Sequence, residues 1–293
     1  MPEQRDFRID VRRARKNFNA AAHHYDEAAV LQREVGQRLV DRLDYVNCRP
    51  ATIMDLGSGT GRTTEQLRRR FRKARILQVD FAIEMLEQAA HRSRRWFSRK
   101  SPVCAAAEAL PFAGTVDMTF SNLMLQWCNE PGLVFSQVHD AMIEGGLFIF
   151  SSFGPDTLTE LRQSWAAVDG DTHVNMFLDM HDLGDALASA GFQNPVMEAE
   201  RFTLTYDDVP ALYRDLKGLG AANTTAGRRR TLTGKTRLQQ VAAAYNRFRQ
   251  AGRLPATFEV VYGHAWNSRP GLSRMQAGVA AVPVSRIKRT LRD

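Results

Sequence analysis

A short apolar run that ends in an acid and opens into three alternating glycines constrains this chain more than any other feature. It spans residues 53–61, with Asp55 ahead of Gly57, Gly59 and Gly61. Glycine has no Cβ, so a glycine turn between a strand and a helix lets backbone N–H groups approach a ligand. The spacing predicts a nucleotide-type pocket, with a plain β-turn as the alternative, and we expect the Asp55 carboxylate to favour a cationic or ammonium-bearing ligand.

Length and composition predict a globular α/β protein. The chain has 293 residues, of which 44% are hydrophobic and 25% charged, enough for a full core with an appended subdomain. No apolar run approaches the roughly 18 to 20 residues of a membrane helix, and the arginine-rich start lacks the apolar stretch of a secretory signal. Asp6 and Asp10 interrupt that start, which disfavours a mitochondrial transit peptide. We therefore expect a cytoplasmic protein with no membrane partner.

Cysteine usage and charge point away from metal and nucleic acid. Cys48, Cys104 and Cys128 are isolated and lack metal-ligand spacing, so we expect reduced packing residues and no metal. Much of the formal net charge of +8 lies in residues 268–293, a tail with little apolar periodicity. We interpret it as a flexible, solvated appendage, with a nucleic-acid-binding arm as the alternative. The rest of the chain is only mildly basic, and we expect no nucleic-acid partner.

Residues 18–46 precede the first strand. From Ala28 to Val46 apolar side chains recur at three- and four-residue steps, the stripe of an amphipathic helix. The segment before it, residues 18–26, is rich in aromatic and histidine side chains. We expect Tyr25 to line the pocket, and the alternative is an ordinary helix N-terminus capped by Asp26.

A second acid strengthens the case for a cofactor pocket. The strand predicted over residues 76–80 ends at Asp80, about 20 residues beyond Gly57, where an acid accepts both hydroxyls of a bound ribose. The glycine turn with Asp55 ahead of it resembles the first motif of class I S-adenosylmethionine (SAM) methyltransferases. Residues 105–112 resemble the adenine-binding segment of that family. One acid of the segment is replaced by Ala106, so we expect a backbone carbonyl or a water to make its contact.

The resemblance implies a doubly wound, Rossmann-like sheet of the class I methyltransferase type. Strands are expected at residues 116–122, 147–151 and 257–262, and substrate is expected to enter at residues 122–128. Phe81 is expected against the adenine face. The SAM-binding residues that the resemblance implies are Asp55, Gly57, Ser58, Gly59, Gly61, Asp80, Phe81, Met85, Ala107, Glu108, Asn122 and Leu123.

More restricted motifs resemble the malonyl-acyl-carrier-protein O-methyltransferase (BioC) family of biotin synthesis. They lie at residues 21–26, 31–33, 121–128, 173–175, 216–221 and 232–233, and the resemblance runs from about residue 11 to 266. It implies transfer of the SAM methyl group to the free carboxylate of a malonyl thioester on acyl-carrier protein, or on CoA. The products are a malonyl methyl ester and S-adenosylhomocysteine (SAH).

A malonyl carboxylate is already ionised near neutral pH, so this reaction needs no general base. The pocket should instead offer donors to the carboxylate and thioester, for which the candidates are Tyr25, Gln126, Trp127, His173, Asn175 and Lys217. His173 alone also fits a structural histidine. Arg162 is a further candidate anion partner, or an exposed helix arginine.

Residues 153–255 are expected to form a helical cap for the substrate, together with elements that return to the core. Helical periodicity covers 156–168, 180–190, 209–220 and 235–250. We expect an N-terminal helical segment over the cofactor at 1–47, the SAM-binding core at 48–152 and a closing strand at 256–267. A basic cluster on the cap is expected to steer the acidic carrier protein, with a solvated loop as the alternative. Its members are Arg228, Arg229, Arg230, Lys235 and Arg237.

Two other functions remain open. One is a related assembly factor of respiratory complexes that hydroxylates protein arginine, because such proteins share the Gln126-Trp127 segment. The other is a SAM-binding scaffold without transferase activity. We expect a monomer or a weak dimer.

Overall fold

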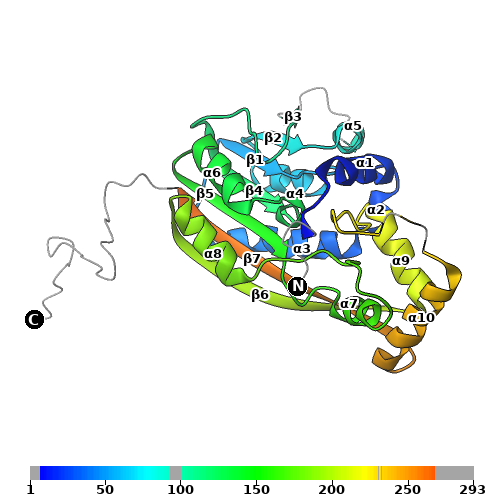
Figure 1. Cartoon of the computed structure of the whole chain (residues 1–293). Coiled ribbons are helices and arrows are strands. Elements are labelled where there is room, and N and C mark those ends of the chain that lie inside the picture. Colours follow the sequence, from blue (N-terminus) through cyan, green and yellow to red (C-terminus); the bar gives the residue numbers. More distant parts are fainter. Residues whose placement is uncertain (1–6, 93–99, 230, 232, 268–293) are drawn as a thin grey trace, which may run out of the picture.

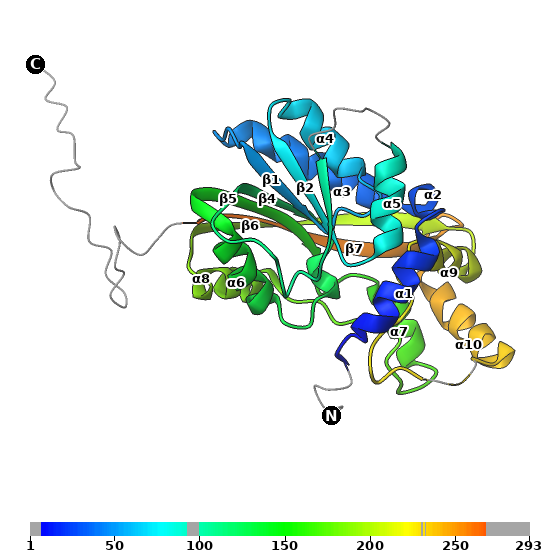
Figure 2. The ribbon, with the colours of Figure 1, turned by 90° about the horizontal axis from the view of Figure 1, so that it is seen from above.

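A seven-stranded mixed sheet organises the described part of the chain, which comprises residues 7–92, 100–229, 231 and 233–267 of the computed structural model. The strand order is β3-β2-β1-β4-β5-β7-β6, and helices cover both faces of the sheet (Figures 1 and 2). The predicted doubly wound α/β fold is confirmed. The strands are β1 (Thr52–Leu56), β2 (Arg75–Asp80), β3 (Lys100–Cys104), β4 (Val116–Asn122), β5 (Met142–Phe153), β6 (Phe192–Tyr206) and β7 (Leu254–Asn267).

The strand order places the glycine turn at a switch point of the sheet. Strands β1 to β5 pair in parallel, whereas β7 is antiparallel to both of its neighbours. The chain leaves β1 for β2 on one side and later returns to β4 on the other side. Ligands of open parallel sheets bind off the carboxyl ends of the strands at such a point. Residues 57–61 follow β1 there.

Each face of the sheet has its own core. α3 (Val30–Asp41) packs on the face that carries Ile53 of β1. α6 (Pro131–Ala141) and α8 (Met180–Ser189) pack on the opposite face, with the next residue, Met54. Neighbouring residues of a strand point to opposite faces, so a strand covered on both sides must be apolar throughout. The short apolar run before the glycine turn has this character.

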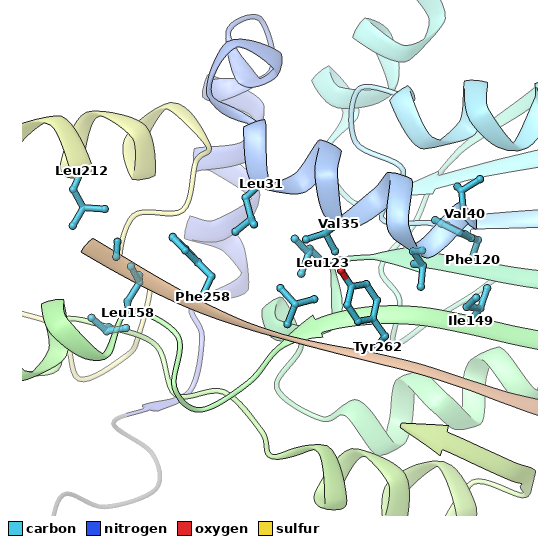
Figure 3. Close-up of a cluster of buried hydrophobic side chains, with 14 of the residues drawn as sticks. Leu31, Val35, Val40, Phe120, Leu123, Ile149, Leu158, Leu212, Phe258 and Tyr262 are labelled. Carbon is cyan, nitrogen blue, oxygen red and sulfur yellow. The ribbon is translucent and has the colours of Figure 1, made fainter. Parts of the chain in front are cut away.

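Figure 3 shows how the first of these helices is fixed on the sheet. Leu31 and Val35 point from α3 toward the strands, where Phe120 and Tyr262 belong to the same buried cluster. The predicted apolar stripe is confirmed as the core-facing side of α3 at Leu31, Val35 and Leu39, whereas Ala28 and Val46, the ends of the predicted helix, lie outside α3. The remaining helices are α1 (Val11–Ala21), α2 (Tyr25–Ala28), α4 (Arg62–Arg70), α5 (Ile83–Arg92), α7 (Thr159–Ala166), α9 (Val209–Gly218) and α10 (Lys235–Tyr245), with 3-10 turns η2 (Arg42–Tyr45), η3 (Leu125–Trp127) and η4 (Asn246–Phe248).

The expected helical cap is interrupted by a strand that the sequence analysis missed. β6 lies inside residues 153–255 and pairs along its length with β7 at the edge of the sheet. The C-terminal half of β6 alternates apolar and polar residues, as in Phe202-Thr203-Leu204-Thr205, because one face of the strand is covered and the other meets solvent. α8 packs against β6 and α6, so this predicted cap helix belongs to the core.

Three of the four predicted cap helices gather away from the core helices. α7, α9 and α10 lie together at one end of the molecule, near α1 and α2 (Figures 1 and 2). Arg230 and the predicted tail, residues 268–293, lie outside the described residues. Among the helices that are described, none combines the length and the apolar character needed to cross a bilayer.

Candidate cofactor and substrate site

The glycine turn has the backbone conformation that its sequence demands. Gly57, Gly59 and Gly61 have φ of +76°, +53° and +76°, a region that residues with a Cβ rarely adopt. A Cβ on Gly57 would lie 2.4 Å from the Met124 side chain. A Cβ on Gly59 would meet nothing within 4 Å. The first glycine is therefore required by packing, and the second lies beside open space.

The expectation that these glycines present backbone N–H groups to a ligand is wrong. The N–H groups of Gly57 and Ser58 both donate to the Val79 carbonyl, at 2.8 and 3.0 Å. Gly59 N–H donates to the Asp80 carboxylate, and Gly61 N–H donates to the carbonyl of Ser58. The N–H groups of Gly57, Ser58 and Gly59 hold the turn against the end of β2, and that of Gly61 closes the turn itself. The turn shapes the pocket, and its acids and side chains are left to make the polar contacts.

Asp80 is held in place by two backbone donors. Its Oδ2 accepts from Gly59 N–H and its Oδ1 from Ala82 N–H, both at 2.9 Å. Burial raises the pKa of Asp80 to about 6, against the lowering effect of these hydrogen bonds. Each carboxylate oxygen keeps a further lone pair. Asp80 can therefore accept two more hydrogen bonds from a ligand in the adjoining cavity.

Asp55 lies behind the turn and lines neither of the two cavities described below. It is 1% exposed, and its Oδ2 accepts a hydrogen bond of 2.5 Å from Thr64 Oγ1 at the start of α4. Burial raises the pKa of Asp55 to about 7. The expected direct contact between this carboxylate and a cationic ligand is therefore not present in the geometry. Asp55 joins β1 to α4 and so fixes the turn between them.

A first cavity extends from the glycine turn to the end of β4. It brings together twelve of the predicted site residues, from α2, the turn, β2, α5 and the segments after β3 and β4. They are Tyr25, Gly57, Gly59, Asp80, Phe81, Met85, Ala107, Glu108, Asn122, Leu123, Gln126 and Trp127. Ser58 lines an adjoining recess, and Gly61 packs against Ala89.

The N-terminal helices α1 and α2 form one side of this cavity. Asp26 accepts from Thr60 Oγ1 at 2.8 Å and pairs with Arg92, so α2 is tied to the glycine turn. The alternative role of Asp26 as a helix cap is therefore wrong. Burial, with help from the nearby acids Asp80 and Asp26, raises the pKa of Tyr25, so its hydroxyl stays protonated and remains a donor.

An aromatic wall stands opposite the turn. Phe18 of α1 meets Trp127 edge-on, with ring centroids 5.0 Å apart, and approaches Phe81 at 5.8 Å. The sequence analysis quoted the segment that begins at Phe18 but assigned a role only to Tyr25. The three rings bring together α1, the end of β2 and η3. They give the cavity an apolar side.

The end of β4 is fixed by side-chain hydrogen bonds. Asn122 accepts from Ser151 Oγ at 2.8 Å and donates to the carbonyl of Gln32 at 3.0 Å. Its amide is thus used to join α3, β4 and β5. Leu123 has φ of +50°, which turns the chain into η3. Gln126 then donates to the Leu123 carbonyl, while its own Oε1 is buried without a hydrogen-bond partner in the described part of the chain.

A second, larger cavity of about 840 Å³ lies beyond this wall, under α7 and α9. His173, Asn175 and Lys217 line it, together with Gln126 and Trp127, as the sequence analysis grouped them. Its volume is within the range of small-molecule sites.

His173 is held on two sides. Its ring stacks on Trp165 with centroids 3.5 Å apart and an interplanar angle of 8°. Its Nε2 lies 2.7 Å from Asp169, an acceptor, so the N–H at this position is already used. This nitrogen is therefore not free for substrate, and a hydrogen bond from His173 to substrate would have to come from Nδ1.

Asp169, Asp171 and His173 are close enough together to hold a metal ion among the described residues. Each acid faces an arginine instead, with Arg237 3.5 Å from Asp169 and Arg229 3.7 Å from Asp171. These ion pairs compensate the acids. The cluster joins the start of α10 and the loop before it to the wall of the larger cavity.

Most arginines of the predicted carrier-binding cluster form ion pairs with acids of the same chain. Arg228 lies 3.5 Å from Asp10 and donates to the Thr225 carbonyl, and its side chain is 13% exposed. Arg229 and Arg237 pair as described above, whereas Lys235 is exposed at the start of α10. The side chains on this surface are therefore partly neutralised by neighbouring acids.

Some residues of the site were missed by sequence reasoning, and the prediction for Arg162 was wrong. Arg13 and Arg214, which line the larger cavity, were missed, whereas Cys128 lies in the expected substrate-entry segment and lines the smaller cavity. No local motif marks the two arginines, which come from helices about two hundred residues apart in sequence. Arg162 donates to the carbonyls of Pro155 and Thr157 at 3.0 Å, so it is neither an anion partner nor an exposed helix arginine.

The two cavities share one wall. Six residues line both of them: Gln32, Gln126, Trp127, Phe153, Leu219 and Ala221. The two cavities are therefore adjacent, with these residues between them.

Comparisons with known proteins agree with this arrangement. The family model "Methyltransferase domain" matches residues 54–150. The malonyl-[acyl-carrier protein] O-methyltransferase of Laribacter hongkongensis is 52% identical over 268 residues, which cover 89% of this chain and 90% of the relative. The protein of the same name from Gallionella capsiferriformans is 46% identical, covering 94% of this chain and 97% of the relative.

Among solved structures, the YcgJ protein of Bacillus subtilis has a TM-score of 0.59 at 12% identity. The match covers 80% of this chain and 99% of YcgJ, and it supports the fold alone. The two relatives extend well beyond the match to the family model, across both cavities. The chain belongs to the malonyl-[acyl-carrier protein] O-methyltransferase family.

Proposed function

We propose that this protein transfers the methyl group of SAM to the free carboxylate of a malonyl thioester on acyl-carrier protein. The observation that carries the proposal is the wall that the two cavities share, where Gln126 and Trp127 face both. The name of the relatives supports the choice of substrate. The products are a malonyl methyl ester and SAH, and we place the reaction in biotin synthesis. The cytoplasmic location stays a prediction.

The smaller cavity has the features that an adenosyl cofactor requires. Asp80 offers two anchored carboxylate oxygens, Phe81 and Met85 offer apolar surface, and the space beside Gly59 is open. We expect Asp80 to accept the ribose hydroxyls and Phe81 to lie against the adenine. Glu108 lines the same cavity, and we expect it at the adenine edge. SAM supplies a methyl group activated by its sulfonium sulfur.

The residues of the chain act by positioning and by excluding water. A malonyl carboxylate is ionised above about pH 5, so no side chain has to remove a proton. We expect the ring of Trp127, which lines both cavities and packs edge-on against Phe18, to exclude water at the shared wall. Holding two reactants in contact in this way contributes up to about 7 to 11 kcal/mol. The expectation that no metal takes part stays a prediction.

Hydrogen-bond donors then orient the acceptor. The Tyr25 hydroxyl, kept protonated by its raised pKa, lies on the cofactor side. Gln126 Nε2 keeps one hydrogen after bonding to the Leu123 carbonyl, and the Asn175 amide lies in the larger cavity. Lys217 is exposed where that cavity opens. We expect these four to contact the malonyl thioester along its length.

The test is the pH dependence of kcat at saturating SAM. We expect kcat with malonyl thioester to be flat from about pH 6 to 8, because the nucleophile does not titrate there. An acetyl thioester, which lacks the free carboxylate, is the matched control and should accept no methyl group. A steep fall of kcat below neutral pH at full SAM occupancy would require a titrating base and contradict the proposal. An arginine hydroxylase or a scaffold would transfer no methyl group at all.

A further inference from the structure

Three cations without partners stand where the larger cavity opens. Arg13 of α1 and Arg214 and Lys217 of α9 line this cavity, and all three are exposed. Within the described part of the chain, none of their side chains has an ion pair or a hydrogen bond. No aspartate or glutamate among the described residues lines the cavity. The opening therefore carries uncompensated positive charge.

Neighbouring arginines show that this absence of partners is specific to the opening. Arg228, Arg229 and Arg237 each face an acid on nearby loops and helices. Like charges around a concave opening raise the local potential and attract an anion. The two α9 cations lie three residues apart and so share one face of the helix. An anionic group at the opening would contact α1 and α9 together.

Deeper in the cavity the polar groups are of another kind. Asn175 Oδ1, Gln126 Oε1 and Gln32 Oε1 are buried there without a hydrogen-bond partner in the described residues. Asn175 and Gln126 are each only 9% exposed. A buried acceptor without a donor costs free energy, so such groups indicate a ligand that brings N–H donors. The cavity thus has exposed positive charge in one part and buried amide acceptors in another, and two of these acceptors, Gln32 and Gln126, belong to the wall shared with the cofactor cavity.

We propose that the larger cavity binds the pantetheine arm of the thioester, with the arm's phosphate at Arg13, Arg214 and Lys217. This inference rests on the proposed function, because it takes a malonyl thioester as the substrate. The arm has the matching groups: a phosphate, two amides whose N–H groups can reach Asn175 and Gln126, and the acyl thioester. Carrier protein and CoA both carry this phosphate on the arm. The site would therefore recognise the arm and not the body of the carrier.

The test compares two ligands that differ only in the phosphate. Binding of malonyl-phosphopantetheine and of malonyl-pantetheine to the SAH-saturated full chain is measured by calorimetry. The native protein should prefer the phosphorylated ligand by about tenfold or more, since charge-assisted hydrogen bonds are strong. In the double variant Arg13→Gln/Arg214→Gln the preference should fall to about twofold. Arg15→Gln, on the same helix and exposed but outside the cavity, is the matched control and should keep the preference.

Each outcome decides the question. An equal affinity of the native protein for both ligands, or an undiminished preference in the double variant, overturns the proposal. A double variant that binds malonyl-carrier protein more weakly but keeps its preference between the small ligands also overturns it, because the cations then read the carrier surface. If the double variant loses affinity for malonyl-CoA and for malonyl-carrier protein by the same factor, the proposal is supported. A phosphate preference without any methyl transfer would refute the proposed function and leave the phosphate site standing.

Discussion

Asparagine in place of Asp80 should weaken the binding of SAH by roughly ten- to a hundredfold. The two carboxylate oxygens each accept one backbone N–H at 2.9 Å, from Gly59 and Ala82, and we expect each to accept one ribose hydroxyl. Asparagine keeps one acceptor and carries no charge. One hydrogen bond to a charged group is worth about 1.5 to 3 kcal/mol, and each 1.4 kcal/mol corresponds to about tenfold in affinity. Alanine, which removes both acceptors, should cost about a hundredfold to ten-thousandfold.

Calorimetry with two ligands separates this ribose contact from a general disturbance. SAH and methylthioadenosine share the ribose and adenine, so Asp80→Asn should weaken both by the same factor. Asp182→Asn, on the exposed side of α8, is the matched control and should change neither affinity. Thermal melting establishes that each variant is folded. Unchanged affinity for both ligands in a folded Asp80→Asn protein would refute the assignment.

Further predictions concern the turn, the buried acid behind it and the donor over the cofactor. Gly57→Ala places a Cβ 2.4 Å from the Met124 side chain at a φ of +76°, so it should abolish SAH binding and lower the melting temperature, whereas Gly114→Ala, with a φ of +55° and open space, should not affect binding. Burial raises the pKa of Asp55 to about 7, so the folded protein holds a proton that the unfolded chain has released. Stability should then fall as the pH rises from about 4 to 7, with Asp80 contributing in the same direction up to about pH 6. Melting curves of Asp55→Asn should therefore lose the slope between about pH 6 and 7 and keep the part that belongs to Asp80. Tyr25→Phe should lower kcat by roughly tenfold to a thousandfold with little change in SAM affinity, measured by steady-state kinetics and calorimetry, and an unchanged kcat would exclude Tyr25 as an orienting donor.

Local patterns predicted four of the five parallel strands and the turn, because the chemistry there is local, but they did not predict β3. A short apolar run that ends at a glycine turn is typical of a central strand buried on both faces, and Gly57 supplies the positive φ of that turn. Asp80 was found by its distance from the turn, since the length of one βαβ unit sets that spacing. The cofactor side of the site was therefore largely predictable.

Contacts between distant segments could not be read in the same way. The N–H groups of the turn were expected to face a ligand, yet Val79 and Asp80 accept them, because β2 lies beside β1 only in the folded sheet. Arg228 was predicted to be a surface charge for the carrier protein, but in the folded chain it lies beside Asp10, more than two hundred residues away in sequence. Arg214 carries no motif, and only the approach of α1 and α9 makes it part of a cavity.

The most direct test of the account is the position of a labelled methyl group after incubation of the protein with methyl-labelled SAM and malonyl-acyl-carrier protein. The account predicts that the label enters the carrier protein as an ester of the malonyl carboxylate, so that mild alkali releases it as methanol. The same incubation with acetyl-carrier protein should leave the label on SAM. Label on the malonyl carbon chain or on the protein itself, or consumption of no SAM by a protein that binds it, would contradict the account.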